Sequence, residues 1–189
     1  APPAPAEAAA EFHEPHEPIA TKPEFAARYP HEDPAYSAHH GNITQLDAAF
    51  GRLMAALEDQ KLAADTLVLF SSDNGPAITP QHPYGSAGPL RDRKGGIRVP
   101  GLLRWPGRIS PGGESAEAVC GLDFLPTICD ALDLPLPANR AMDGASMLPV
   151  FEGKPVERTT PLYWHFNRAF GGPKVAMRDG DWKLVAALD

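Results

Sequence analysis

A carboxylate and a side-chain amide stand side by side at Asp73 and Asn74, directly after the apolar run Leu67–Phe70. That run is typical of a short buried strand, and the Ser-Ser-Asp-Asn-Gly-Pro segment that follows it consists of turn formers. In an open α/β sheet, ligand-handling groups gather where parallel strands end at their carboxyl side. Carboxylate and amide oxygens are hard donors that suit Ca²⁺ or Mg²⁺. The pattern indicates a cation site, with a plain Asx turn as the structural alternative.

Two cysteines and a pair of adjacent histidines are further candidates for chemistry. Cys120 and Cys129 fit no metal-ligand spacing and lie in an apolar helical context, which predicts buried free thiols. We expect His39 and His40 on the solvated surface rather than in a site.

The composition bounds the class of protein. The 189 residues include 17 Lys+Arg against 24 Asp+Glu, a net charge of −7, which argues against a general nucleic-acid binder. Within the 189 residues we find no apolar run long enough to cross a membrane and no signal-peptide pattern at the N-terminal end. Together with the charge balance, this predicts neither a membrane nor a nucleic-acid partner. The 22 prolines and 17 glycines indicate a chain rich in loops.

The first half of the chain predicts one helix and one strand after a linker-like, disordered lead over residues 1–11. Residues 22–40 are expected to form a loop with one short helical turn. The helix is expected from about Gly41 or Thr44 to Gln60, because four apolar residues recur at helical spacing: Leu46, Phe50, Leu53 and Leu57. The strand is expected over Thr66–Phe70, which makes one α/β unit.

The second half predicts a long loop, one further helix and a set of strands. The loop is Ile78–Gly96, and a strand interrupted by Pro100 follows over Ile97–Trp105. Asp123 is positioned to cap a helix over Phe124–Leu132, and a short helical turn is expected within 144–153. Three short strands, with a hairpin signal at Asp179-Gly180, predict a small antiparallel subdomain: Leu162–Phe166, Lys174–Arg178 and Trp182–Leu188.

Four segments occur in a fixed order: His13-Glu-Pro-His16-Glu-Pro, the Ser-Asp73-Asn74-Gly-Pro turn, Gly85–Gly101 and Arg104-Trp-Pro-Gly. From about Phe12 to its end, the chain resembles the type I, formylglycine-dependent sulfatases of the arylsulfatase and N-acetylgalactosamine-6-sulfatase-like branch. The resemblance implies a partial alkaline-phosphatase-like α/β sheet with helices on its faces. We expect the C-terminal half of that α/β domain over 12–155 and the start of the small antiparallel subdomain over 156–189.

The resemblance also implies roles for individual residues. Asp73 and Asn74 match the family's strand-end Ca²⁺ ligands, with Mg²⁺ as the alternative ion. Lys94 matches a lysine that contacts the sulfate, although a short segment usual in the family after it is absent here. His16 matches a histidine that reaches the sulfate or the leaving oxygen, and it could donate a hydrogen bond or a proton there. His13, by contrast, is expected only to pack in its loop.

Several features depart from the family pattern. No Cys/Ser-x-Pro/Ala-x-Arg motif, the source of the formylglycine nucleophile, occurs in the 189 residues, and neither does the Asp-Asp pair that completes the Ca²⁺ site. We therefore expect the chain alone to be inactive towards sulfate esters. We also expect a sheet that lacks strands, with an unpaired edge, an exposed apolar face and marginal stability.

Three functions remain open at this point. The first is a sulfuric ester hydrolase that acts on a sulfated small molecule or sulfated glycan and is periplasmic, secreted or lysosomal by resemblance. The second is a phosphate or phosphonate ester hydrolase of the alkaline-phosphatase-like group, which would favour two zinc ions. The third is a non-catalytic sulfatase remnant or a sulfated-glycan-binding module. The sequence does not predict an oligomeric state.

Overall fold

The computed structural model of the chain describes residues 10–12, 14–16, 18–76, 83–86, 97–167 and 174–187. The chain divides into two compact units, of which the first comprises residues 1–63 and 75–96 and the second residues 64–74 and 97–189. The predicted lead lies mostly within residues 1–9, outside the described residues, and so do His13 and Lys94. The predicted boundaries at residues 12 and 156 stay a prediction.

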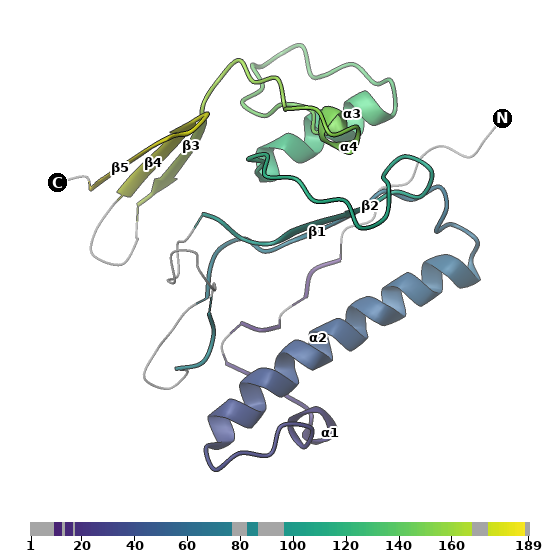
Figure 1. The fold of residues 1–189 in the computed structure, drawn as a ribbon, viewed down its shortest axis with the longest axis vertical. Helices are drawn as coiled ribbons and strands as arrows, with labels where there is room; N and C mark the ends of the chain where they lie inside the picture. The colour runs from purple at the N-terminus through teal and green to yellow at the C-terminus, as the bar shows by residue number, and fades with distance from the viewer. Residues whose placement is uncertain are drawn as a thin grey trace. The chain divides into compact units, whose positions relative to one another are not determined.

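Two helices organise the first unit, as Figure 1 shows: the short α1 (Pro23–Ala26) lies beside the N-terminal part of the long α2 (Pro34–Asp59). Gly41 permits this close approach, because a Cβ atom there would lie 2.7 Å from the backbone nitrogen of Ala26. The loop before α1 is pinned to α2 by side-chain amides. Gln45 accepts a hydrogen bond from the backbone N–H of Lys22, and Asn42 donates one to the carbonyl of Ala20.

Helix α2 begins seven residues before the earliest start predicted from the sequence, so the expected loop over residues 34–40 is wrong. Asp33 caps the helix by accepting a hydrogen bond from the backbone N–H of Ala35, and Pro34 occupies the first turn, where a missing N–H removes no hydrogen bond. The earlier start also overturns the expectation for His39, which is only 7% exposed, and for His40, which is half-buried.

The C-terminal end of α2 is closed by a Schellman motif. The N–H of Leu62 donates to the carbonyl of Leu57 at 2.8 Å, and that of Lys61 to Glu58 at 2.9 Å. Lys61 has a φ of 59°, the left-handed conformation that such a motif requires and that glycine adopts most easily.

The apolar stripe on α2 is only partly covered in the described residues. Leu46, Phe50 and Leu57 are half-buried, and Leu53 is 36% exposed. The buried residues of the helix are His39, Gly41 and Asn42, all near its N-terminal end. The core-facing stripe predicted from the sequence therefore stays partly open in the described residues.

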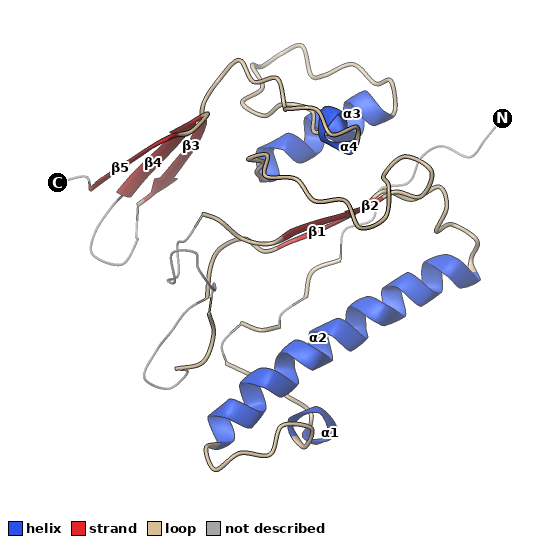
Figure 2. Ribbon diagram, viewed as in Figure 1, coloured by secondary structure: helices blue, strands red, loops and turns tan. Residues whose placement is uncertain are grey.

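The second unit begins with a two-stranded sheet of β1 (Val68–Ser71) and β2 (Gly101–Arg104), drawn in red in Figure 2. The strands are antiparallel, with Val68 opposite Arg104 and Ser71 opposite Gly101. The strand-end pattern at Asp73 predicts parallel neighbours for β1, whereas its described partner runs in the opposite direction. Pro100 lacks a backbone N–H, and the strand begins directly after it.

A helical segment follows β2. A 3₁₀ turn, η1 (Gly121–Asp123), leads directly into α3 (Phe124–Ala131), and the short α4 (Leu148–Phe151) contacts α3. Helix α3 matches its predicted span closely, but the predicted cap is wrong, because the Asp123 side chain makes no capping hydrogen bond to it. Cys129 in α3 is buried as predicted, Cys120 is half-buried, and both thiols are free.

The three C-terminal strands form the predicted antiparallel meander: β3 (Leu162–Phe166), β4 (Lys174–Asp179) and β5 (Trp182–Ala187). Gly180, with a φ of 52°, belongs to the tight turn between β4 and β5. Tyr163, Met177 and Leu184 are register partners across the three strands and are 56%, 38% and 59% exposed. They form an apolar row on one face of the sheet, which we call the exposed row.

In the part of the chain that the structure describes, none of the helices combines the length and the apolar character that crossing a membrane requires.

Candidate metal site at the end of strand β1

Asp73 and Asn74 lie in the turn that follows β1, and the structure brings their side chains together. The Nδ2 group of Asn74 donates a hydrogen bond to Oδ2 of Asp73. Asp73 is exposed and Asn74 half-buried, so the carboxylate is accessible to an ion from solvent. The two side chains predicted as a ligand pair therefore contact each other, and their role as metal ligands stays a prediction.

Two serines shape this turn. Ser71 donates a hydrogen bond to the carbonyl of Pro100 at 3.1 Å, which ties the end of β1 to the residue before β2. Ser72 donates to the carbonyl of Asn74 at 3.0 Å and to Oδ1 of Asp73 at 3.5 Å. These local hydrogen bonds fix the path of the turn and leave the Asp73 carboxylate facing solvent.

A hollow of about 400 Å³ adjoins Asp73 in the second unit. One wall comes from the end of β1 and the other from the junction of η1 and α3, and the lining residues are Leu69, Ser71, Ser72, Asp73, Gly121 and Phe124. No sequence signal indicates that Gly121 and Phe124 face this turn, because they are about 50 residues away along the chain and follow an ordinary helix-start pattern.

The described residues do not complete a metal centre by themselves. Within the described ranges, no group of three or more His, Cys, Asp or Glu side chains is arranged to hold a metal ion. Asp73 and Asn74 therefore supply one carboxylate and one amide oxygen, and an ion held here needs additional oxygen ligands. Asn74 also has to turn its amide so that Oδ1, instead of Nδ2, faces the ion.

His16 belongs to the first unit, whereas Asp73 and Asn74 belong to the second, and Lys94 is outside the described residues. His16 is exposed, and its segment is held to α2 because Nε2 of Gln45 donates a hydrogen bond to Glu14 at 2.8 Å. The roles inferred for His16 and Lys94 thus stay predictions.

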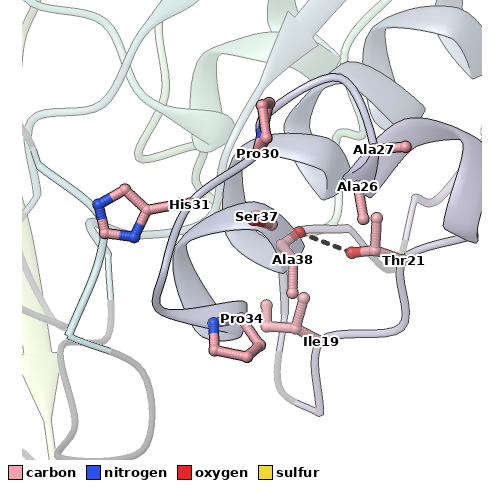
Figure 3. A pocket seen from close by; sticks show the side chains of 9 residues that line it. All are labelled: Ile19, Thr21, Ala26, Ala27, Pro30, His31, Pro34, Ser37 and Ala38. Carbon is pink, nitrogen blue, oxygen red and sulfur yellow. Dashed lines mark hydrogen bonds between the residues drawn. The ribbon is translucent and has the colours of Figure 1, made fainter.

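A second, shallower hollow of about 490 Å³ lies in the first unit, between the loop before α2 and the first turns of that helix (Figure 3). Thr21 donates a hydrogen bond to the carbonyl of Ala38 across it at 2.7 Å. Its lining is mostly small and apolar, and His31 stands at its rim with the ring directed away from the other side chains. Neither Asp73, Asn74 nor His16 contributes to it.

Comparison with known proteins places the chain in a family. The family model described as Sulfatase matches residues 9–134, and the model described as N-sulphoglucosamine sulphohydrolase, C-terminal, matches residues 93–187. The chain is 34% identical to steryl-sulfatase of Mus musculus over 158 residues, which is 78% of this chain and 24% of the relative. It is 41% identical to arylsulfatase A of Homo sapiens over 117 residues, 59% of this chain and 23% of the relative.

The solved structures show the same relationship. The crystal structure of Ps i-CgsB superimposes with a TM-score of 0.80 at 28% identity and covers 92% of this chain and 39% of that one. The chain spans about a quarter of the length of the curated relatives that it matches. Its partial α/β sheet and small antiparallel sheet agree with part of the sulfatase fold. Because a family model matches well over half of its residues, the chain belongs to the sulfatase family.

Proposed function

We propose that this chain is the part of a sulfate ester hydrolase that supplies Asp73 and Asn74 as ligands of a Ca²⁺ ion. The observation that carries the proposal is the convergence of these two side chains in one accessible turn beside a hollow, in a chain of the sulfatase family. The donor set consists of hard oxygens, as Ca²⁺ and Mg²⁺ prefer, and contains no thiolate or imidazole that would favour zinc.

Residues of the chain and the bound ion would each contribute to the reaction. Bound at Asp73 and Asn74, a divalent cation would polarise the oxygens of a sulfate ester. The His16 imidazole would donate a hydrogen bond or a proton to the sulfate or its leaving oxygen, a role that histidine often takes in catalysis. The Lys94 ammonium would hold the sulfate as a compact positive charge.

The substrate class that we propose is a sulfated small molecule or a sulfated glycan. A similar solved structure is Ps i-CgsB in complex with k-i-k-neocarrahexaose, which shows an oligosaccharide on a protein of this fold. By the same family argument we place the protein in the periplasm, outside the cell or in the lysosome.

One observation favours a second candidate. The 189 residues contain no Cys/Ser-x-Pro/Ala-x-Arg motif that could yield a formylglycine nucleophile. A chain that acts without that motif would be a non-catalytic remnant or a binding module for sulfated glycans. The net charge of −7 disfavours binding of an anionic glycan through a broad surface, so the hydrolase is the better-supported proposal.

The metal assignment can be tested by titrating the chain with CaCl₂, MgCl₂ and ZnCl₂ in a calorimeter. With few protein ligands, we expect a calcium dissociation constant of about 10⁻³ M or weaker. Asp73→Asn should weaken it by at least about tenfold, because it removes the only charged ligand that the turn offers. Asp65→Asn makes the same charge change on an exposed residue just before β1 and should leave calcium binding unchanged.

The reaction can be tested on the longest reading frame that contains these residues, with 4-nitrophenyl sulfate and 4-nitrophenyl phosphate as substrates. We expect calcium-dependent release of 4-nitrophenol from the sulfate ester. This release should be lost in Asp73→Asn and kept in Asp65→Asn. Preferential release from the phosphate ester with zinc would overturn it in favour of the phosphatase alternative. No release from either substrate, together with retention on a sulfated glycan column, would identify the binding module.

A further inference from the structure

One wall of the hollow beside Asp73 comes from a segment outside β1. This wall consists of Gly121 and Phe124, at the junction of η1 and α3. Asp123 lies between these two residues in the sequence, but its side chain is directed into the protein, where it is 0% exposed. What holds Asp123 therefore determines where the wall stands.

The Asp123 carboxylate accepts four hydrogen bonds, which is about as many as its two oxygens can accept. Two come from the guanidinium of Arg158, one to each oxygen, both at 2.7 Å. The backbone N–H groups of Cys120 and Ala145 donate the others, at 2.7 and 2.9 Å. Arg158 also donates to the carbonyl of Ala118 at 2.8 Å, so one guanidinium holds the chain before η1 and the carboxylate within it.

A second set of contacts fixes the same junction from the segment around residue 145. The hydroxyl of Thr127 donates to the carbonyl of Asp123 at 2.6 Å and accepts from the N–H of Met147 at 2.8 Å. Gly144 packs directly on the backbone of Leu122, where a Cβ atom would lie 2.0 Å from the carbonyl oxygen. These bonds are buried and leave the junction little freedom to move.

We propose that the Asp123–Arg158 ion pair is the positioning device of the hollow: it fixes the Gly121–Phe124 wall opposite the Asp73 turn. The bidentate geometry makes this specific to arginine, since a lysine ammonium is a single point charge that cannot hold both carboxylate oxygens and the Ala118 carbonyl together. That the positioned hollow serves a metal-dependent hydrolase rests on the proposed function; the positioning itself does not.

The two cysteines provide a readout that separates local movement of the wall from general unfolding. Cys120 immediately precedes η1, and its N–H is one of the donors to Asp123. Burial, aided by the nearby Asp123 charge, raises the pKa of the Cys120 thiol against the opposing effect of Arg158, which slows its alkylation while the wall is in place. Loss of the Arg158 charge alone would raise this pKa further and slow labelling, so faster labelling reports that the wall has opened. Cys129 is buried within α3, away from the 3₁₀ turn, so its thiol reports on the helix as a whole.

The experiment measures alkylation of each cysteine by iodoacetamide, followed by mass spectrometry, in the full chain. Arg158→Gln should speed labelling of Cys120 by at least about tenfold and change that of Cys129 by less than about twofold, because only the wall opens. Arg158→Lys should give an intermediate Cys120 rate, and it also carries the test if Arg158→Gln does not fold. Arg140→Gln, the same change at an exposed arginine, should leave both rates unchanged.

The proposal is overturned if both cysteines accelerate together in the folded Arg158 variants, because the pair would then only stabilise the unit. It is equally overturned if the Cys120 rate stays at the wild-type value. Titration of the same proteins with CaCl₂ tests the proposed metal site, where Arg158→Lys should weaken calcium binding. A wild-type chain that binds no calcium, but whose Arg158 variants show the selective Cys120 effect, would refute the metal assignment and support the positioning role.

Discussion

The hydroxyl group of Tyr84 donates a 2.6 Å hydrogen bond to Oδ2 of Asp33, the same residue whose other oxygen caps helix α2. The ring of Tyr84 stands edge-on to that of Tyr36, with centroids 5.2 Å apart. The helix cap thus also anchors residues 83–86, the described part of the predicted Ile78–Gly96 loop. The hydrogen bond from Tyr84 lowers the pKa of Asp33, and the bond raises the pKa of Tyr84 in return.

Replacing Tyr84 by phenylalanine should therefore raise the pKa of Asp33 towards its ordinary value of 3.8, because the charged carboxylate loses its strongest stabilising partner. Titration of the carboxyl carbon by NMR would measure the shift. Tyr163→Phe removes the same hydroxyl from an exposed ring on β3 and should leave Asp33 unchanged. An Asp33 pKa that does not move in Tyr84→Phe would mean that the hydrogen bond is absent in solution.

Two glycines on α2 should respond to alanine in opposite directions. Gly41→Ala places a methyl group against the backbone of α1 and should destabilise the chain by about 2 to 3 kcal/mol. A Cβ atom at Gly51 would meet no neighbour within 4 Å, and Gly51→Ala should stabilise the chain by up to about 1 kcal/mol through helix propensity. Urea denaturation followed by circular dichroism would compare them, and equal effects would contradict the α1–α2 packing.

Glycine should be more favourable than lysine at position 61, which follows the C-terminal end of α2. Lys61 adopts a φ of 59°, so Lys61→Gly removes a steric conflict between the side chain and the backbone and should stabilise the chain by about 1 kcal/mol. Ala55→Gly, in the exposed interior of the same helix, should destabilise by a similar amount. Thermal unfolding of both variants would show whether each change raises or lowers stability. A loss of stability in Lys61→Gly would argue against the Schellman motif at the end of α2.

The Asp123–Arg158 pair should make stability depend on acid pH. Burial by itself raises the pKa of Asp123, but hydrogen bonds from Arg158 and from the N–H groups of Ala145 and Cys120 outweigh burial and lower it. A carboxyl group with a lowered pKa contributes stability above its unfolded value, here 3.8, and this contribution is lost as the pH falls through the folded value.

Asp123→Asn should accordingly destabilise the chain by about 3 to 5 kcal/mol at pH 7, because Arg158 is left largely buried without its partner. The difference from the wild-type protein should persist down to about pH 5 and narrow below about pH 4. Urea denaturation at a series of pH values between neutrality and strong acid measures it. Asp143→Asn, an exposed control, should show no such narrowing, and a difference for Asp123→Asn that does not depend on pH would contradict the charged pair.

The elements predicted correctly from the sequence are those whose signals lie close together in the chain. Helix α3, the three C-terminal strands and the pairing of Asp73 with Asn74 follow from periodicity and turn residues that lie next to one another in the chain. The predicted start of α2 was wrong although its signal is also local. Asp33-Pro34 is a helix-start pattern, and Tyr36 and His40 continue at helical spacing, but these rings do not belong to the aliphatic stripe from which the helix was predicted. The error about the burial of His39 followed from the missed start.

The relationships that depend on distant residues could not be predicted. Nothing near Arg158 indicates that it binds Asp123, and nothing near Tyr84 indicates that it reaches Asp33, 51 residues earlier in the chain. The antiparallel pairing of β1 with β2 is of the same kind, because a single strand pattern does not specify the direction of its neighbour. The family resemblance supplied residue roles but no such contacts.

The exposed row of Tyr163, Met177 and Leu184 has a practical consequence for handling the protein. In the described sheet β5 is an edge strand, and Trp182 at its start is 84% exposed, so apolar rings and unpaired backbone groups are available together to another molecule. Charge repulsion opposes such contact at neutral pH but vanishes near the isoelectric point of about 5.5. Colloidal stability should therefore be lowest in mildly acidic buffers, and purification is best kept well above that pH.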